Sequence, residues 1–70
     1  MRISSFTEYE LEHLRQNCNF VGNEKDVFRL RSEGVSLELI AEMLGYTNDG
    51  IKKVSRRINN KIIKVLDHEI

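Results

Sequence analysis

Six basic side chains lie between residues 52 and 64, and no acidic residue interrupts them. They are Lys52, Lys53, Arg56, Arg57, Lys61 and Lys64. The chain as a whole carries 11 basic and 11 acidic residues and no formal net charge, so its charge is segregated rather than in excess. Bases gathered on one segment favour the binding of a polyanion such as a nucleic-acid backbone. The same pattern also occurs on an ordinary solvated helix face.

The other reactive side chains form no catalytic or metal-binding pattern. His13 and His68 are far apart in the sequence and lack Cys or acidic ligands at a metal-binding spacing. The only cysteine, Cys18, lies on an apolar helix face without a Cys/His signature, so we expect a buried structural thiol. A single cysteine also suits a reducing, cytoplasmic setting. We therefore expect no enzyme, no metal site and no cofactor.

Helix caps and apolar periodicity predict an all-α fold, a compact four-helix domain. Seventy residues form one small domain, and no apolar run approaches the ~20 residues of a membrane span. We divide it into an N-terminal helix and connection (1–22), a support helix (23–35), a helix-turn-helix pair (36–58) and a C-terminal extension of the last helix (59–70). The loops would be short, as is usual between neighbouring helices.

Local signals place the first two helices. Thr7 with Glu10 three residues later is a capping-box pattern, and this first helix is expected to end near Asn17. The second helix is expected to have Asn23 as its N-cap, since an Asn side chain can accept a hydrogen bond from the first turn. Gly34 is expected to end this helix in a left-handed conformation.

The third and fourth helices are delimited in the same way. Ser36 and Gly45 bound the third helix, and the fourth runs from about Asn48 to Leu66. At ~100° per residue, one narrow apolar stripe of the fourth helix contains Ile51, Val54, Ile58, Ile62 and Val65. Most of its bases fall on the opposite side, whereas Lys61 lies at the edge of the stripe, where its stem can snorkel. The break at Gly45-Tyr46-Thr47 between these two helices predicts a sharp angle.

Residues 24–66 resemble the helix-turn-helix of bacterial DNA-binding proteins. The closest forms are region 4 of sigma-70-like factors and the C-terminal domains of LuxR-type regulators. The residues that carry the resemblance are Ile40, Ala41, Leu44, Gly45, Tyr46, Ile51 and Val54. Ala41 would permit close helix approach, and Gly45 would be the turn residue with positive φ. Two residues depart from the pattern: Gly50 weakens the first turn of the last helix, and Asp49 repels phosphate.

The resemblance implies a small sequence-specific transcriptional regulator of bacterial or phage type that binds double-stranded DNA through the helix from about Asn48. The implied DNA-contacting residues are Ser36, Thr47, Asn48, Asp49, Lys52, Lys53, Arg56 and Arg57. By this analogy the residues at 48, 49 and 52 contact bases in the major groove, and those at 53, 56 and 57 lie nearer phosphates. Thr47 would also cap the helix, and Ser36 would begin a helix whose N–H groups can meet a phosphate.

Other hypotheses remain open at this point. Zero net charge, Asp49 and Gly50 favour a sigma-region-4-like protein-interaction module that binds RNA polymerase or another regulator. A further alternative is an assembly component of a larger complex that uses the long helix. Ile63 and Leu66 lie off the apolar stripe: either the first helix covers them, or they join Tyr9 in a homodimer contact or a site for another chain.

Overall fold

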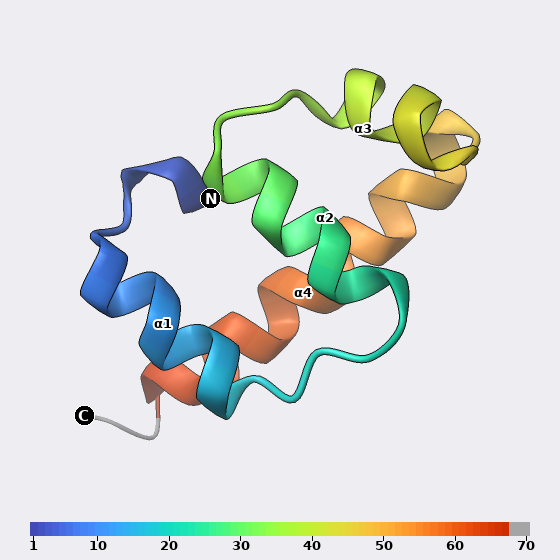
Figure 1. The fold of residues 1–70 in the computed structure, drawn as a ribbon. Helices are drawn as coiled ribbons and strands as arrows, with labels where there is room; N and C mark the ends of the chain where they lie inside the picture. The colour runs from blue at the N-terminus through green and yellow to red at the C-terminus, as the bar shows by residue number, and fades with distance from the viewer. Residues whose placement is uncertain (68–70) are drawn as a thin grey trace.

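The computed structural model describes residues 1–67 and is helical, with no strand among those residues (Figure 1). The elements in chain order are a short 3-10 turn η1 (Ile3–Ser5), then α1 (Glu8–Asn17), α2 (Asn23–Ser32), α3 (Leu37–Leu44) and α4 (Asn48–Asp67). The predicted four-helix all-α domain is confirmed. His68 and the last part of the predicted 59–70 extension lie outside the described residues.

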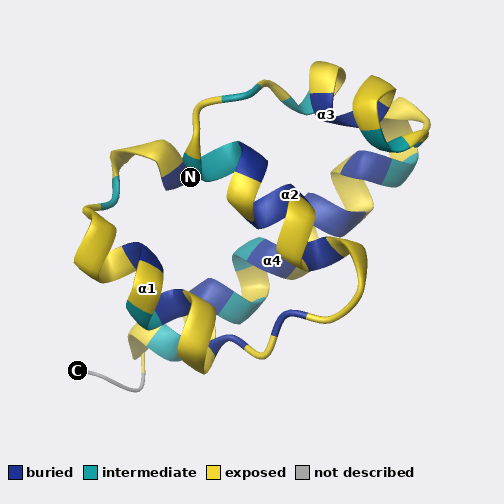
Figure 2. Ribbon diagram, viewed as in Figure 1, coloured by how far each residue is buried: buried dark blue, intermediate teal, exposed yellow. Residues whose placement is uncertain are grey.

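The long helix α4 forms the base on which the other elements pack. It has 20 residues, about 30 Å of helix, in a molecule that measures 35 × 19 × 19 Å. In Figure 1, α1 and α2 cross in front of α4, and α3 lies beside its first turns. The predicted apolar stripe faces this packing, and Ile51, Val54, Ile58 and Ile62 are all buried (Figure 2). Burying each such side chain stabilises the fold by about 2 kcal/mol.

Capping signals fix the helix ends largely as expected. The Thr7 and Glu10 side chains exchange hydrogen bonds with each other's backbone N–H groups, at 2.8 and 3.2 Å, and α1 ends at Asn17. After α2, Gly34 adopts φ 86°, and the next N–H donates to the Leu30 carbonyl at 3.1 Å. The predicted capping box and left-handed stop are therefore confirmed.

The start of α2 differs from the prediction. The N-cap is Gly22, with φ 55°, and Asn23 is already the first helical residue. As the first helical residue, Asn23 lies past the capping position, and its Nδ2 donates to the Tyr46 hydroxyl at 2.5 Å. This contact spans 23 positions in the sequence and joins the start of α2 to the turn after α3.

Residues outside the long helices complete the core. Ile3 of η1 and Phe20 of the α1–α2 connection are both buried, and the Phe20 and Phe28 ring centroids lie 4.7 Å apart. Cys18 is buried as predicted; burial raises the pKa of its thiol, and the charge of Lys61 offsets part of that rise. The ring contact holds the α1–α2 connection against α2.

A polar clamp holds the other flank of α4. Arg31 Nη1 donates to the Asn59 side-chain oxygen at 2.8 Å, and Nη2 donates to the Met1 carbonyl at 3.2 Å. Burial lowers the pKa of the Arg31 guanidinium. Since Asn59 lies on α4 and Met1 precedes η1, one side chain ties three parts of the chain together.

Candidate nucleic-acid interface

A glycine corner separates α3 from α4. Gly45 ends α3 with φ 77°, and both its N–H and the Tyr46 N–H donate to the Ala41 carbonyl. A Cβ at Gly45 would meet no atom within 4 Å, so glycine is favoured here by backbone conformation alone. Other residues would lose about 1 kcal/mol or more in this left-handed geometry. Ala41 is buried, as the close approach of two helices requires.

The first turn of α4 is capped by Thr47. Its Oγ1 accepts a hydrogen bond from the Gly50 N–H at 3.0 Å, and its carbonyl accepts from the Ile51 N–H at 3.0 Å. A Cβ at Gly50 would lie 3.1 Å from Thr47 Oγ1 and 3.5 Å from Tyr46 Cδ1. Glycine therefore leaves room for the cap and for the Tyr46 ring. The sequence showed only its low helix propensity.

The capped end of α4 presents a polar surface to solvent. Exposed residues on it are Thr47, Asn48, Asp49, Lys52, Lys53, Arg56 and Arg57, which include every predicted DNA contact of this helix. The opposite side of the same turns is buried through Ile51, Val54 and Ser55. Ser36 is exposed at the start of α3, where its Oγ accepts from the Leu39 N–H at 3.3 Å.

A buried carboxylate organises the far half of the basic helix. The Glu24 side chain is only 7% exposed and lies 2.5 Å from Lys61 Nζ and 3.5 Å from Arg57 Nε. It also accepts a hydrogen bond from the Val21 N–H at 3.2 Å. Burial by itself raises the pKa of the Glu24 carboxyl, but the hydrogen bonds from Lys61 and Val21 and the charges of Lys61 and Arg57 outweigh it. The net effect lowers the pKa below its ordinary value.

The network around Glu24 changes how two of the bases are understood. Lys61 does more than snorkel: its Nζ also donates to the Asn19 carbonyl at 3.1 Å, so it bridges α4 to the α1–α2 connection. Arg57 remains 62% exposed while it pairs with Glu24. Its positive charge is partly compensated, which leaves Lys52, Lys53 and Arg56 as the bases at the capped end of α4 that lie outside this network.

The sequence missed Glu24 as a site residue. An acid in the first turn of a helix is favoured by the helix dipole wherever it is exposed, so this position gives no sign of a buried role. Its charged partners lie 33 and 37 positions later, and helical periodicity carries no signal at that range. Only the three-dimensional packing brings Lys61 of α4 beside Glu24 of α2 and shows that this acid is buried and paired.

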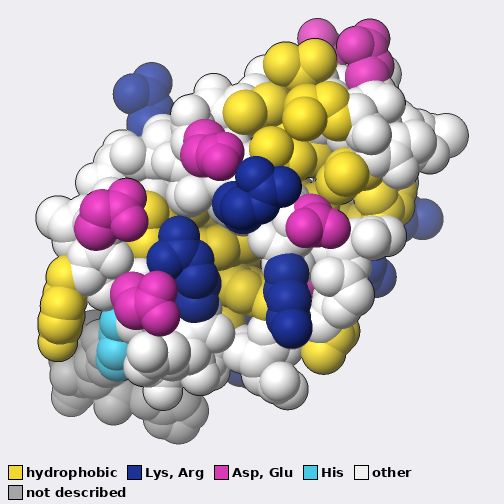
Figure 3. Space-filling model, viewed as in Figure 1, with side chains coloured by type: hydrophobic (Ala, Val, Ile, Leu, Met, Phe, Trp, Pro, Cys, Tyr) yellow, Lys and Arg dark blue, Asp and Glu magenta, His cyan; other side chains and the backbone are white. Residues whose placement is uncertain are grey.

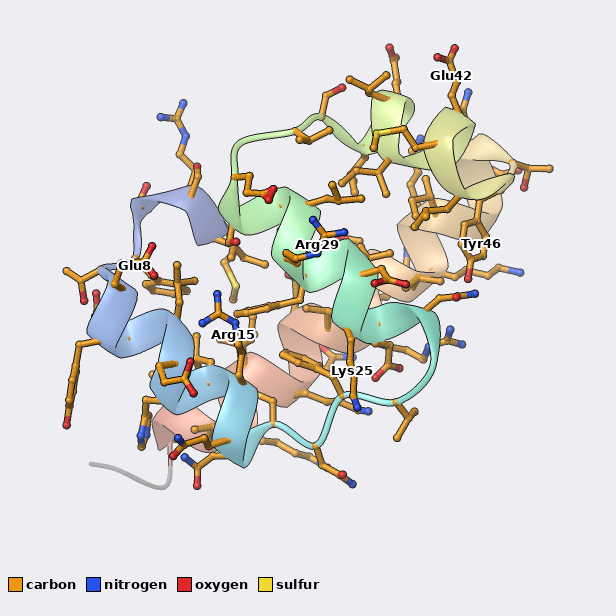
Figure 4. All side chains as sticks on the ribbon, viewed as in Figure 1. Glu8, Arg15, Lys25, Arg29, Glu42 and Tyr46 are labelled. Atoms are coloured by element: carbon orange, nitrogen blue, oxygen red, sulfur yellow. The ribbon has the colours of Figure 1, made fainter. Side chains whose placement is uncertain are left out.

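The outer face of α3 has a different character from α4. Glu38 and Glu42 are exposed there, and so are the apolar side chains of Leu39 and Met43. Glu42 points away from the body of the molecule in Figure 4. The two helices of the corner therefore present an acidic, partly apolar surface and a basic surface.

Helix α1 does not cover Ile63, contrary to one of the two predictions for that residue. Ile63 is 47% exposed, so about half of its side chain remains open to solvent. Leu66 is partly exposed and lines a cavity of about 250 Å³ together with Phe6, Tyr9, Glu10, His13 and Leu14. Tyr9 and His13 therefore approach the end of α4, although most of the Tyr9 side chain faces solvent.

Within residues 1–67, no helix is both long enough and apolar enough to cross a membrane. The same part of the chain brings together no group of three or more His, Cys, Asp or Glu side chains that could hold a metal ion. Comparison with protein-family models, with curated proteins and with solved structures finds no match.

Proposed function

We propose that this protein is a small sequence-specific DNA-binding transcriptional regulator, in which α3, the Gly45 corner and α4 act as a helix-turn-helix. The observation that carries the proposal is the exposed, acid-poor side of α4 at its capped end, beyond a fixed corner. An α-helix fits the major groove of B-DNA, which is about 12 Å wide. The apolar side of α4 holds it on the domain while its polar side remains free for the groove.

Chemistry assigns roles to the side chains at this end. The Asn48 amide can pair with adenine, Lys52 can donate to guanine, and Asp49 can accept from cytosine. Lys53 and Arg56 lie further along the exposed side and suit phosphates. Thr47 keeps its hydroxyl for the helix cap, and the N–H groups that follow Ser36 suit a phosphate beside the groove.

The salt dependence of DNA affinity can be estimated from the number of phosphates that the protein neutralises. If about four phosphates are neutralised, log affinity should fall against log salt with a slope of about −3.6. Between 50 and 200 mM salt, this slope corresponds to a loss of about 100-fold in affinity. Lys52, Lys53, Arg56 and the partly compensated Arg57 would supply these four contacts, whereas Lys61 is held by Glu24.

A homodimer would suit this function, because one copy offers only a short contact surface. Ile63 is exposed on α4, and Tyr9 and Leu66 lie at the same end of the molecule, around the α1–α4 cavity. Two copies joined there could present two recognition helices to half-sites about one turn of DNA apart, the spacing of dimeric helix-turn-helix proteins.

Selection from a random double-stranded DNA pool tests this proposal and reveals the site and its symmetry. The expected result is an enriched motif, whose binding is lost in the double variant Lys52→Glu/Arg56→Glu. Lys64→Glu is the control, because it reverses one positive charge on an exposed part of α4 outside the proposed contact, whereas the double variant reverses two. Absence of an enriched motif, or equal losses in both proteins, would refute sequence-specific binding through this end of α4.

The outer face of α3 favours a second candidate function, a protein-interaction module that binds RNA polymerase or another regulator. Exposed Leu39 and Met43, each next to an exposed acid (Glu38 and Glu42), have the mixed apolar and charged character of a protein contact. Co-purification with polymerase subunits that is lost in Leu39→Ser/Met43→Ser, beside absent DNA binding at every salt concentration, would support this candidate over the first.

A further inference from the structure

A cavity of about 480 Å³ lies between α1 and α2, on residues that the proposed DNA contact does not use. The lining residues are Arg15, Gln16, Asn19, Phe20, Lys25, Asp26, Phe28 and Arg29. This volume falls within the range of about 300 to 1,000 Å³ that is usual for small-molecule sites. Figure 3 shows apolar side chains at the floor of a hollow on this face and basic side chains around it.

Two packed aromatic rings give the cavity a firm apolar floor. The Phe20 and Phe28 centroids lie 4.7 Å apart with a tilt of 34°, and both side chains belong to the buried core. The guanidinium carbon of Arg15 lies 6.0 Å from the Phe28 ring centroid, within cation–π distance. Phe20 is 6% and Phe28 1% exposed, so a flat ring would pack on the accessible part of Phe20 and, once the Arg15 guanidinium moves aside, on the face of Phe28.

The walls of the cavity are cationic. Arg15 from α1 faces Lys25 and Arg29 from α2 across the gap (Figure 4), and Asp26 is the one acid among the lining residues. Arg15 pairs with Glu12 at 3.0 Å and Arg29 pairs with Glu33 at 3.3 Å. All four of these side chains are well exposed, and such pairs contribute little and exchange readily. A ligand carboxylate can therefore compete for either guanidinium, and it gains two parallel hydrogen bonds by doing so.

We propose that this cavity binds an amphipathic organic anion, a planar aromatic group of one or two rings that carries a carboxylate. The ring lies on the Phe20–Phe28 floor, and the carboxylate is held by Arg15 and Arg29, with Lys25 adding positive charge at the wall. An inorganic anion would leave the apolar floor uncovered, and a neutral aromatic compound would leave the guanidinium groups without a new partner. The proposal does not depend on DNA binding, because the two surfaces share no residue.

Titration of the ¹⁵N-labelled protein with 2-naphthoate, followed by amide chemical shifts, tests this proposal. A compound of about 13 non-hydrogen atoms is expected to bind with a Kd on the order of 1 mM, which this method measures well. The expected result is a saturable set of shifts centred on the amides of residues 15–20 and 25–29. The neutral analogue 2-naphthalenemethanol should bind at least about fivefold more weakly, because it lacks the charge-assisted hydrogen bonds.

Variants make the test specific to the cavity. Arg15→Gln/Arg29→Gln should weaken naphthoate binding about tenfold or more, since hydrogen bonds to charged groups are lost. Lys64→Gln, an exposed base that does not line this cavity, should leave binding unchanged. Far-UV circular dichroism verifies that each variant is folded, and the single variant Lys25→Gln serves if the double variant is not. Equal binding of the neutral analogue, shifts scattered over the whole chain, or undiminished binding in the cavity variants would overturn the proposal.

Discussion

Replacement of Glu24 by glutamine is expected to destabilise the fold by about 1 to 2 kcal/mol at pH 7. Glutamine is nearly isosteric and can still accept a hydrogen bond from the Val21 N–H or from Lys61. It cannot supply the negative charge that lies 2.5 Å from Lys61 Nζ and 3.5 Å from Arg57 Nε. The perturbation therefore removes the charge and leaves most of the packing intact.

The stability lost in Glu24→Gln depends on how far Lys61 and Arg57, the charged partners of Glu24, are exposed to solvent. Removing one member of a fully buried ion pair costs about 3 to 5 kcal/mol, because the remaining charge is left without solvent or a partner. Here Lys61 is 30% exposed and Arg57 is 62% exposed, so both can recover water. The expected cost is therefore well below the fully buried value and above the ~0.5 kcal/mol of an exposed pair.

Thermal unfolding followed by circular dichroism at 222 nm would show the loss as a fall in Tm of about 5 to 15 °C. The pH dependence gives a second signature. Because the pKa of Glu24 is lowered in the folded state, its contribution is complete above the pKa of the unfolded chain. It disappears as the pH falls through the lower, folded pKa. The Tm difference between the two proteins should therefore shrink towards zero on acidification from pH 7.

Glu33→Gln is the matched control, because its partner Arg29 is 56% exposed and the pair is an ordinary surface contact. Its change in stability should stay within about 0.5 kcal/mol. If Glu24→Gln proved as mild as this control, or if its Tm difference were the same at pH 7 and at acid pH, the assigned role of the buried carboxylate would be wrong.

Three further predictions concern the corner and the end of α4. Ala41→Leu should cost about 1 to 3 kcal/mol by overpacking a buried position, measured by urea unfolding. Gly45→Ala should cost about 1 kcal/mol or more in the same assay, because φ is 77° and no clash contributes; Gly45→Asn should cost less. Ile63→Glu should reduce self-association in light scattering without lowering Tm; a wild-type protein that stays monomeric at high concentration would contradict the dimer proposal.

The elements of this fold were largely predictable because their signals are local. The Thr7 capping box, the Ser36 cap and Gly45 each act within one turn of their own helix, and the apolar period of α4 needs no knowledge of its neighbours. The prediction for Asn23 was wrong because the chain enters α2 one residue earlier, at Gly22 with φ 55°, a conformation that glycine permits. The Asn23 side chain then lies within the first turn, where its Nδ2 donates to the Tyr46 hydroxyl.

The site could be predicted only in part for the same reason. Exposure of the bases at the capped end of α4 follows from the helical period alone. The role of Gly50 does not, because it depends on the room left between the Thr47 cap and the Tyr46 ring. The same holds for the Glu24 network and for the cavity over Phe20 and Phe28, each of which assembles residues from separate segments that carry no mark of their later neighbours.

The span of α4 couples the two ends of the molecule mechanically. A single rod about 30 Å long runs through a body whose longest dimension is 35 Å, and Glu24 and Arg31 brace it from opposite flanks. α4 is one uninterrupted helix from Asn48 to Asp67, so it bends little between its two ends. Any tilt imposed near Ile63 must therefore swing the capped end by a comparable angle, so the spacing between two paired copies would be fixed by how their far ends meet.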